Sequence, residues 1–300
     1  MTAVLATSSA GATAASAGAS SSAGAWRPVW RKLKRRRGAM VGLVVAALFI
    51  AAALLAPWLA PFDPIETSWS AIRKAPSAAH WFGTDDIGRD VLSRVIWGTR
   101  ASLLAGVVAV SIAVALGVPI GMTAGFAGGF VDALISRLTD AFLACPFLIL
   151  AIALAAFLGP NLTNAMIAIG ISATPIFVRL TRAQVINVKV EEYIEAARAL
   201  GAPPLRIVWR HVLPNILAPV IVQATLAVAA AIIAEASLSF LGLGQQPPAP
   251  SWGSMLNTAK NYVDNAPWMA IWPGLAIFLL VLSFNLLGDG LRDALDPRQR

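Results

Sequence analysis

The chain has 300 residues, of which 58% are hydrophobic and 13% are charged, and its formal net charge is +8. A soluble globular domain has about a quarter charged residues, so this composition indicates an integral membrane protein. The basic residues stand at the ends of apolar runs rather than in one patch, which argues against a nucleic-acid-binding protein.

The chain begins with a segment that is almost all Ala, Ser, Gly and Thr. Such a composition cannot bury a core, so we expect residues 1–25 to form a disordered tail. Residues 26–38 follow as a basic segment that contains seven Lys and Arg. A basic block directly before an apolar run is typical of a cytoplasmic segment.

Six apolar runs are long enough to cross a bilayer, which takes about 20 residues per helix. The expected fold class is therefore all-α, a polytopic membrane protein with six transmembrane helices. The expected spans are residues 39–60, 101–124, 139–158, 162–180, 214–238 and 270–288. Residues 61–100 form a long loop that ends in an expected amphipathic helix, whose apolar stripe contains Val91, Leu92, Val95 and Ile96.

The charges of the loops predict the orientation of these spans. The N-terminal block, the loop around Arg137, the segment 179–211 and the tail 291–300 carry 17 Lys and Arg, whereas the loops 61–100 and 239–269 carry 6. Because positively charged loops stay in the cytoplasm, we expect both termini there and the loop 61–100 outside.

A charged segment separates the fourth and fifth spans, and we call residues 190–214 the elbow. Its first half places apolar residues at i, i+3, i+4 and i+7, namely Tyr193, Ala196, Ala197 and Leu200. Gly201 can stop that helix, and Pro203 or Pro204 can begin another. The second half repeats the pattern with Leu205, Val208, Trp209 and Val212, while Arg206 and Arg210 share the other side. The pattern alone leaves two readings equally open: helices lying on lipid headgroups, or a docking site for a cytoplasmic partner.

The string EAARALG, followed after nine residues by HVLP, resembles the EAA loop of ABC-importer permeases. In that family the loop is the coupling helix that sits in a groove of an ATPase subunit, so the resemblance favours the docking reading. His211 departs from the motif at a usually apolar position, as is common in the peptide-importer branch. The residues assigned to coupling by this resemblance are Tyr193, Glu195, Ala196, Ala197, Leu200, Gly201, Arg206, Arg210, Leu213 and Pro214.

Four other strings resemble the C-type permeases of dipeptide, oligopeptide, nickel and glutathione importers. They are FGTDDIGRDVLSRVIWGTRASL, AGFAGGFVDALISRLTDAF, EASLSFLGLGQQPPAPSWGSML and FNLLGDGLRDALDPR. The likeness covers residues 26–300 and implies a type I ABC-importer permease fold, with a permease core at 101–290. It also implies a bacterial inner-membrane location, a B-type sister permease, two ATPase subunits and an external substrate-binding protein. Short peptides are the favoured substrate, and glutathione and nickel remain open.

The sequence lacks the residues that chemistry in this chain would need. No G-x-x-x-x-G-K-[ST] loop is present, so we expect ATP and magnesium to bind to separate ATPase subunits and not here. The single Cys145 and the two histidines, His80 and His211, have no metal-ligand spacing. We therefore expect no catalytic residue, no metal and no cofactor in this chain.

Two polar residues inside an expected span are candidates for the translocation path or its gate, namely Glu235 and Gln223. A buried acid is costly in a membrane, so Glu235 should face protein or water. The alternative interpretation is a hydrogen-bonded packing residue, or one that reaches the membrane interface. A secondary transporter driven by an ion gradient would need more ionisable residues near the midplane, and an embedded enzyme or a passive channel fits the sequence less well still.

Overall fold

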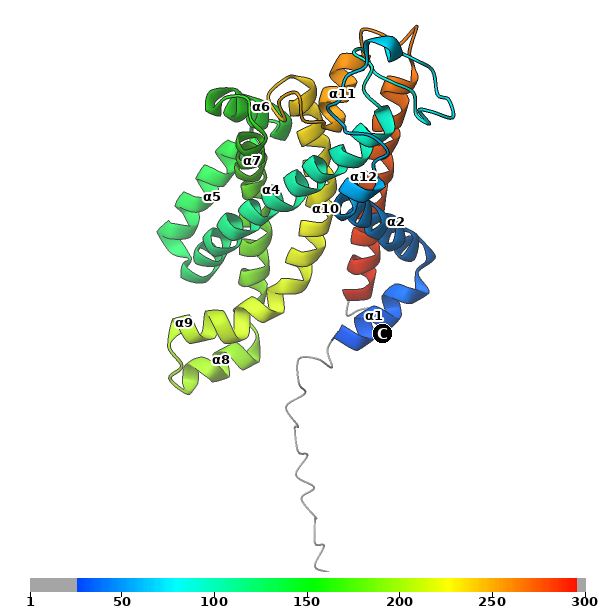
Figure 1. The fold of residues 1–300 in the computed structure, drawn as a ribbon. Coiled ribbons are helices and arrows are strands. Elements are labelled where there is room, and N and C mark those ends of the chain that lie inside the picture. Colours follow the sequence, from blue (N-terminus) through cyan, green and yellow to red (C-terminus); the bar gives the residue numbers. More distant parts are fainter. Residues whose placement is uncertain (1–25, 296–300) are drawn as a thin grey trace, which may run out of the picture.

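Helices account for nearly all of the structure, a computed structural model that describes residues 26–295 (Figure 1). The expected tail 1–25 and the last five residues of the expected tail 291–300 lie outside the described residues. Within the described part, β-structure is limited to one isolated bridge between Thr84 and Asp90. The α-helices are α1 (Trp26–Arg35), α2 (Arg37–Leu54), α3 (Ala56–Leu59), α4 (Val91–Ala127), α5 (Gly129–Leu143), α6 (Phe147–Leu158), α7 (Leu162–Val188), α8 (Glu192–Ala199), α9 (Pro204–Ile207), α10 (Leu213–Phe240), α11 (Trp252–Ala259) and α12 (Trp268–Leu295).

Five helical segments are long and apolar enough to cross a membrane: α2, α4, α7, α10 together with α9, and α12. The sixth candidate is the pair α5 and α6, which are bent by 88° at a short break. The expected third span, 139–158, is therefore not one straight helix. Pro146 is the N-cap of the second piece. Proline has no N–H to continue the hydrogen bonds of the first piece, and it disfavours helix in the residue before it, Cys145.

The helix α4 is 37 residues long, or about 56 Å at 1.5 Å per residue. It joins the expected amphipathic segment of the loop 61–100 to the expected second span without interruption. Val91 and Ile96 are buried against the chain's own helices. The expected helix on the outer surface is therefore the first part of a span, and its apolar stripe is core.

A row of glycines lets α4 approach α7 closely. Gly117, Gly121 and Gly125 recur every four residues on α4. A Cβ atom on Gly121 would lie 2.5 Å from the carbonyl oxygen of Val178, and one on Gly125 would lie 2.8 Å from Cβ of Val185. Small residues of this spacing allow helix backbones to meet in membranes, where lipid tails provide no hydrophobic drive for association.

The residues before α4 fold into a compact cap that also receives α12. Asp90 caps α4 by accepting from the Ser93 amide at 2.8 Å, and its other oxygen lies 2.9 Å from Nδ1 of His80. Trp268, at the start of α12, donates its indole N–H to the Thr84 carbonyl at 3.0 Å. We call this region, residues 61–90, the outer cap, after the side on which the loop charges predict it to lie.

The first expected span, 39–60, is interrupted at Leu55, where α2 ends and the short α3 begins. The helix α2 packs beside α12, and a Cβ atom on Gly42 would lie only 2.6 Å from the Ser283 carbonyl oxygen. At the other end of this contact Arg36 forms an ion pair with Asp293 at 2.7 Å. These contacts attach the first span to the last one (Figure 1).

Candidate functional site

The elbow projects from the end of the molecule opposite the outer cap (Figure 1). It consists of α8, a turn, α9 and a π-helical segment, Val208–Val212, that runs directly into α10. The turn is closed by two hydrogen bonds, from the Ala202 amide to the Ala197 carbonyl at 3.1 Å and from the Gly201 amide to the Arg198 carbonyl at 2.9 Å. Gly201 has a φ of +77°, which a residue with a side chain rarely adopts. The motif is the Schellman ending of a helix, with glycine at its left-handed position.

Two isoleucines hold the elbow against the helices that cross the membrane. Ile194 of α8 is 0% exposed and Ile207 of α9 is 1% exposed. Both belong to a buried cluster whose other members come from α4, α7, the π-helical segment and α10, namely Val118, Met122, Val185, Val212, Ile216 and Val220. The sequence interpretation did not single out these two anchors. The signal that could have found them is their apolar character on the side opposite the assigned stripe.

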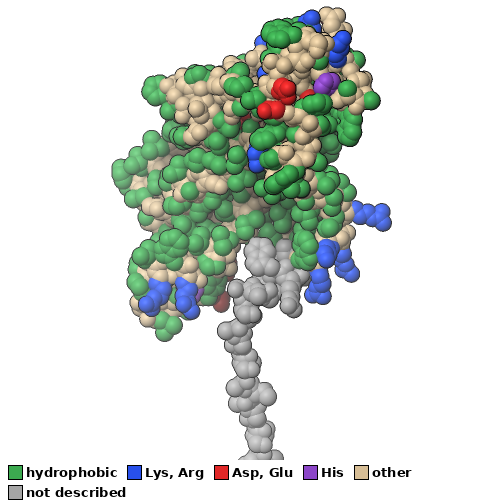
Figure 2. Space-filling view, viewed as in Figure 1, with side chains coloured by type: hydrophobic (Ala, Val, Ile, Leu, Met, Phe, Trp, Pro, Cys, Tyr) green, Lys and Arg blue, Asp and Glu red, His purple; other side chains and the backbone are tan. Residues whose placement is uncertain are grey.

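The apolar residues that the sequence assigned to one face of each elbow helix are mostly turned outward. Leu200 is 88% exposed, Leu205 69%, Trp209 59% and Tyr193 42%. Ala197 and Leu213 are half-buried, while the other assigned residues are exposed: Glu195, Ala196, Gly201, Arg206, Arg210 and Pro214. The elbow thus presents four large apolar side chains among charged ones, and in Figure 2 lysine and arginine gather at this end of the molecule.

One ring contact joins the two halves of the elbow, and a second joins the elbow to α4. The rings of Tyr193 on α8 and His211 in the π-helical segment lie 6.5 Å apart. Burial, together with the negative charge of nearby Glu191, raises the pKa of the Tyr193 phenol above its ordinary value. The phenol is therefore neutral at physiological pH. The guanidinium of Arg198 lies 5.9 Å from the ring centre of Phe126, near the end of α4.

Glu235, one of the two candidates for the translocation path, is enclosed by the chain's own helices. It is 0% exposed, and its two carboxyl oxygens accept hydrogen bonds from Ser102 of α4 at 3.0 Å and from Ser239 at 2.7 Å. Ser239 Oγ also accepts from the Gln245 amide at 3.1 Å. This geometry favours the packing interpretation of Glu235 over a role in the path.

Gln223, the second candidate, is half-buried on α10. It lines a pocket of about 130 Å³ between α4, α6, α7 and α10, together with Phe147, Ala173 and Phe177. The rest of the lining is apolar, so Gln223 is the polar side chain of this pocket. The structure does not bring Gln223 into hydrogen-bonding contact with Glu235; the two lie at different levels of α10.

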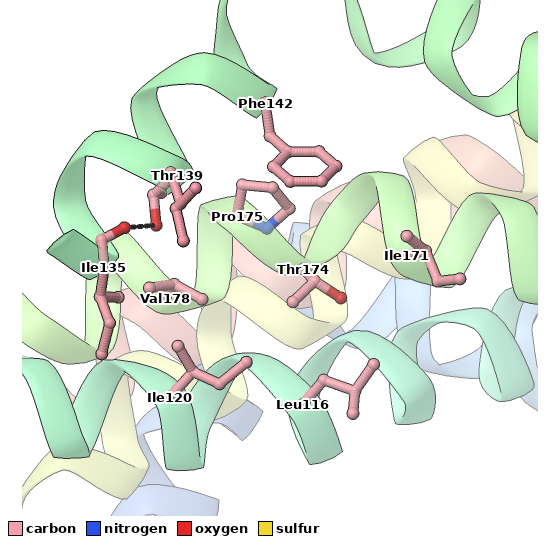
Figure 3. Close-up of a pocket in the computed structure, with 10 residues that line it drawn as sticks. Leu116, Ile120, Ile135, Thr139, Phe142, Ile171, Thr174, Pro175 and Val178 are labelled. Atoms are coloured by element: carbon pink, nitrogen blue, oxygen red, sulfur yellow. Dashed lines mark hydrogen bonds between the residues drawn. The ribbon is translucent and has the colours of Figure 1, made fainter.

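A larger pocket of about 250 Å³ lies between α4, α5 and α7 (Figure 3). Its lining is almost entirely apolar, with Leu116, Ile120, Ile135 and Phe142 among the side chains that surround it. The hydroxyl of Thr139 donates to the Ile135 carbonyl at 2.7 Å, so it is satisfied within its own helix. The pocket offers no acid–base or ligand chemistry, and it reflects the loose contact of α5 with its neighbours: on this helix only Thr139 is buried.

Comparison with known proteins agrees with the membrane fold. Residues 117–300 match the family model described as binding-protein-dependent transport system inner membrane component. The chain belongs to this family. Residues 24–76 match a second model, the N-terminal transmembrane domain of oligopeptide transport permease C. The protein is therefore a multi-pass inner-membrane transport component.

Relatives within this family are permease proteins of known transport systems. The chain is 48% identical over 235 residues to a dipeptide transport system permease protein of Alkalihalophilus pseudofirmus, covering 78% of this chain and 77% of that one. It is 48% identical over 244 residues to a di/tripeptide transport system permease protein of Pseudomonas aeruginosa, covering 79% and 80%. It is 51% identical over 227 residues to a glutathione transport system permease protein of Shigella flexneri, covering 76% and 75%.

A solved structure shares the fold at lower sequence similarity. A chain of the MetNI methionine ABC transporter, in an inward-facing conformation, superimposes with a TM-score of 0.55 at 23% identity. The superposition covers 68% of this chain and 96% of the other. The expected all-α fold of an ABC-importer permease is thereby confirmed.

Proposed function

We propose that this chain is the C-type permease of a peptide importer, with both termini in the cytoplasm. It forms half of a pore with a B-type sister permease, and two ATPase subunits and an external binding protein complete the assembly. Two of the relatives are permeases of dipeptide and di/tripeptide transport systems, which supports short peptides as the substrate. The glutathione permease is as similar, and glutathione is itself a small peptide, so it is the second candidate substrate.

The elbow carries this proposal. Its inner side is fixed by Ile194 and Ile207, while its outer side exposes Leu200, Leu205 and Trp209. An exposed surface with large apolar side chains is typical of a protein–protein contact. Tryptophan is frequent among the residues that dominate binding energy in such contacts. Because the anchors join the elbow to α4, α7 and α10, a partner that moved the elbow would also move three helices that cross the membrane.

The mechanism we propose is alternating access. ATP binding closes the ATPase pair, the elbow transmits this movement, and the pore opens outward to accept substrate from the binding protein. Hydrolysis returns it to the inward-facing state. ATP shifts this equilibrium only to the extent that it binds the two states with different affinity. The elbow residues transmit force and perform no chemistry; ATP and magnesium bind to the ATPase subunits.

Co-purification of the tagged, solubilised chain with its partners tests the assignment. Leu200→Glu combined with Trp209→Glu should abolish recovery of the ATPases and leave the sister permease bound. The matched control is Trp69→Glu, at a tryptophan of the outer end that is 78% exposed, more than Trp209, and it should leave ATPase recovery unchanged. Unchanged recovery with the elbow variant would refute docking at this surface. Transport by the chain reconstituted alone would favour a secondary transporter.

A further inference from the structure

The helix α5, the first half of the bent pair that is the sixth candidate span, has a polar side. Asp132, Ser136 and Asp140 recur every four residues, and Arg137 lies next to them. Leu134, Leu138 and Phe142 occupy the opposite side, where Leu138 and Phe142 line the apolar pocket of Figure 3. An amphipathic helix in a membrane is expected to turn its polar side toward water or protein.

Two ion pairs join this polar side to α7, and they differ in exposure. Arg182 pairs with Asp132, and their side chains are 34% and 21% exposed. Arg179 pairs with Asp140, and their side chains are 60% and 59% exposed. Arg137 is also exposed and forms no ion pair with the residues that the structure describes. We call Arg137, Asp140 and Arg179 the charged strip.

The position of Arg179 along α7 puts the charged strip toward the cytoplasmic end of this candidate span. Arg179 is 17 residues beyond Leu162, which is about 25 Å along a helix, whereas the hydrocarbon core is about 30 Å thick. All 17 residues from Leu162 to Val178 are uncharged. Exposed charges at this depth are unfavourable against lipid tails, and charged residues of membrane helices mark substrate paths and water-filled cavities.

We propose that the charged strip lines the translocation path near its cytoplasmic end and binds the two charged termini of a passing peptide. This inference rests on the proposed function. The peptide carboxylate would pair with Arg179, whose guanidinium can hold a carboxylate with two parallel hydrogen bonds. The peptide ammonium would pair with Asp140. Because the two residues pair with each other when no peptide is present, each charge keeps an opposite partner as a zwitterion arrives and leaves.

Cysteine accessibility tests the location of the strip. In the assembled importer, with Cys145 replaced by Ala, single cysteines at positions 137, 140 and 179 should react with a charged, membrane-impermeant thiol reagent. A cysteine in place of Leu48, a residue 64% exposed on α2, is the lipid-facing control and should not react. Transported dipeptide should slow the reaction at 140 and 179. Reactivity as low as that of the control would overturn the proposal, and reaction without protection by dipeptide would overturn peptide binding.

Transport assays test the contact with substrate. Arg179→Gln and Asp140→Asn should each lower dipeptide uptake about tenfold, the loss expected for one charge-assisted hydrogen bond, while binding-protein-stimulated ATP hydrolysis persists. The matched control is Arg182→Gln, which removes the less exposed pair and should lower uptake and ATP hydrolysis in parallel. A parallel loss in the Arg179 and Asp140 variants would assign them a structural role and refute the proposal. An unsubstituted importer that carried no dipeptide would instead refute the proposed function.

Discussion

The Ala202 amide donates to the Ala197 carbonyl across Gly201, and this bond sets the angle between the two halves of the elbow. The bond forms only because Gly201 occupies the left-handed region, with a φ of +77°. Nothing lies within 4 Å of the position that a Cβ atom on Gly201 would take, so the constraint comes from the backbone and not from crowding.

Replacement of Gly201 by Val should therefore change the elbow without changing insertion into the membrane. A side chain in the left-handed region costs about 1–2 kcal/mol, and the β-branched valine is among the least tolerated there. We expect normal membrane levels, weaker ATPase attachment and loss of uptake. Gly242→Val is the matched control, since Gly242 has a φ of +80° and equally open surroundings. Normal ATP-driven uptake by Gly201→Val would contradict the coupling role of the turn.

The close contact between α4 and α7 predicts the effect of adding one methyl group. A Cβ atom on Gly121 would lie 2.5 Å from the Val178 carbonyl oxygen, so Gly121→Ala forces the helices apart. Overpacking of this kind costs about 1–3 kcal/mol, measured as a lower unfolding midpoint of the solubilised protein. Gly274→Ala on α12 is the control: its Cβ would meet nothing within 4 Å, so stability should stay equal or rise. Equal stability of the two variants would show that α4 and α7 have room for a methyl group at Gly121.

Substitutions of Glu235 separate packing from gating. Glu235→Gln can still hydrogen bond with Ser102 and Ser239, so we expect nearly normal stability and uptake. Glu235→Leu leaves both hydroxyls without this partner and should destabilise the protein by about 1–3 kcal/mol, measured by thermal unfolding in detergent. If Glu235→Gln abolished uptake at unchanged stability, the carboxylate would have a direct part in transport.

The orientation inferred from loop charge can be measured with two exposed positions. With Cys145 replaced by Ala, a cysteine at Trp81, 68% exposed in the outer cap, should react with an impermeant reagent added outside intact cells. A cysteine at Leu200, 88% exposed in the elbow, should react only after the membrane is made permeable. The reverse pattern would place both termini outside.

The sequence was sufficient for the fold class, because long apolar runs have few alternatives in a membrane. It did not predict the break between α5 and α6. The break lies at Pro146, but membrane helices often tolerate proline, as at Pro119 and Pro175, and the outcome depends on packing against neighbours. The continuity of α4 was missed for a related reason, since the polar residues of its first turns belong to the outer cap and not to a separate surface helix.

The elbow could be located from its motif, but its inner and outer sides could not be told apart. The eight residues of α8 carry apolar side chains on both sides, with Ile194 on one and Leu200 near the other. One side is covered by the chain itself and the other is exposed in it. A hydrophobic pattern records that both sides avoid water, and it does not distinguish cover by the same chain from cover by a partner.

The length of α4 connects two regions that the sequence treats as unrelated. Its first turn is fixed in the outer cap by Asp90, and near its far end Val118 and Met122 pack with the anchors of the elbow. Over a rod of about 56 Å, a tilt of about 1° at one end displaces the other by about 1 Å. In the proposed importer, the surface expected to meet the binding protein and the surface expected to meet the ATPase subunits are therefore joined by one continuous helix, so a movement at one end is passed along α4 to the other.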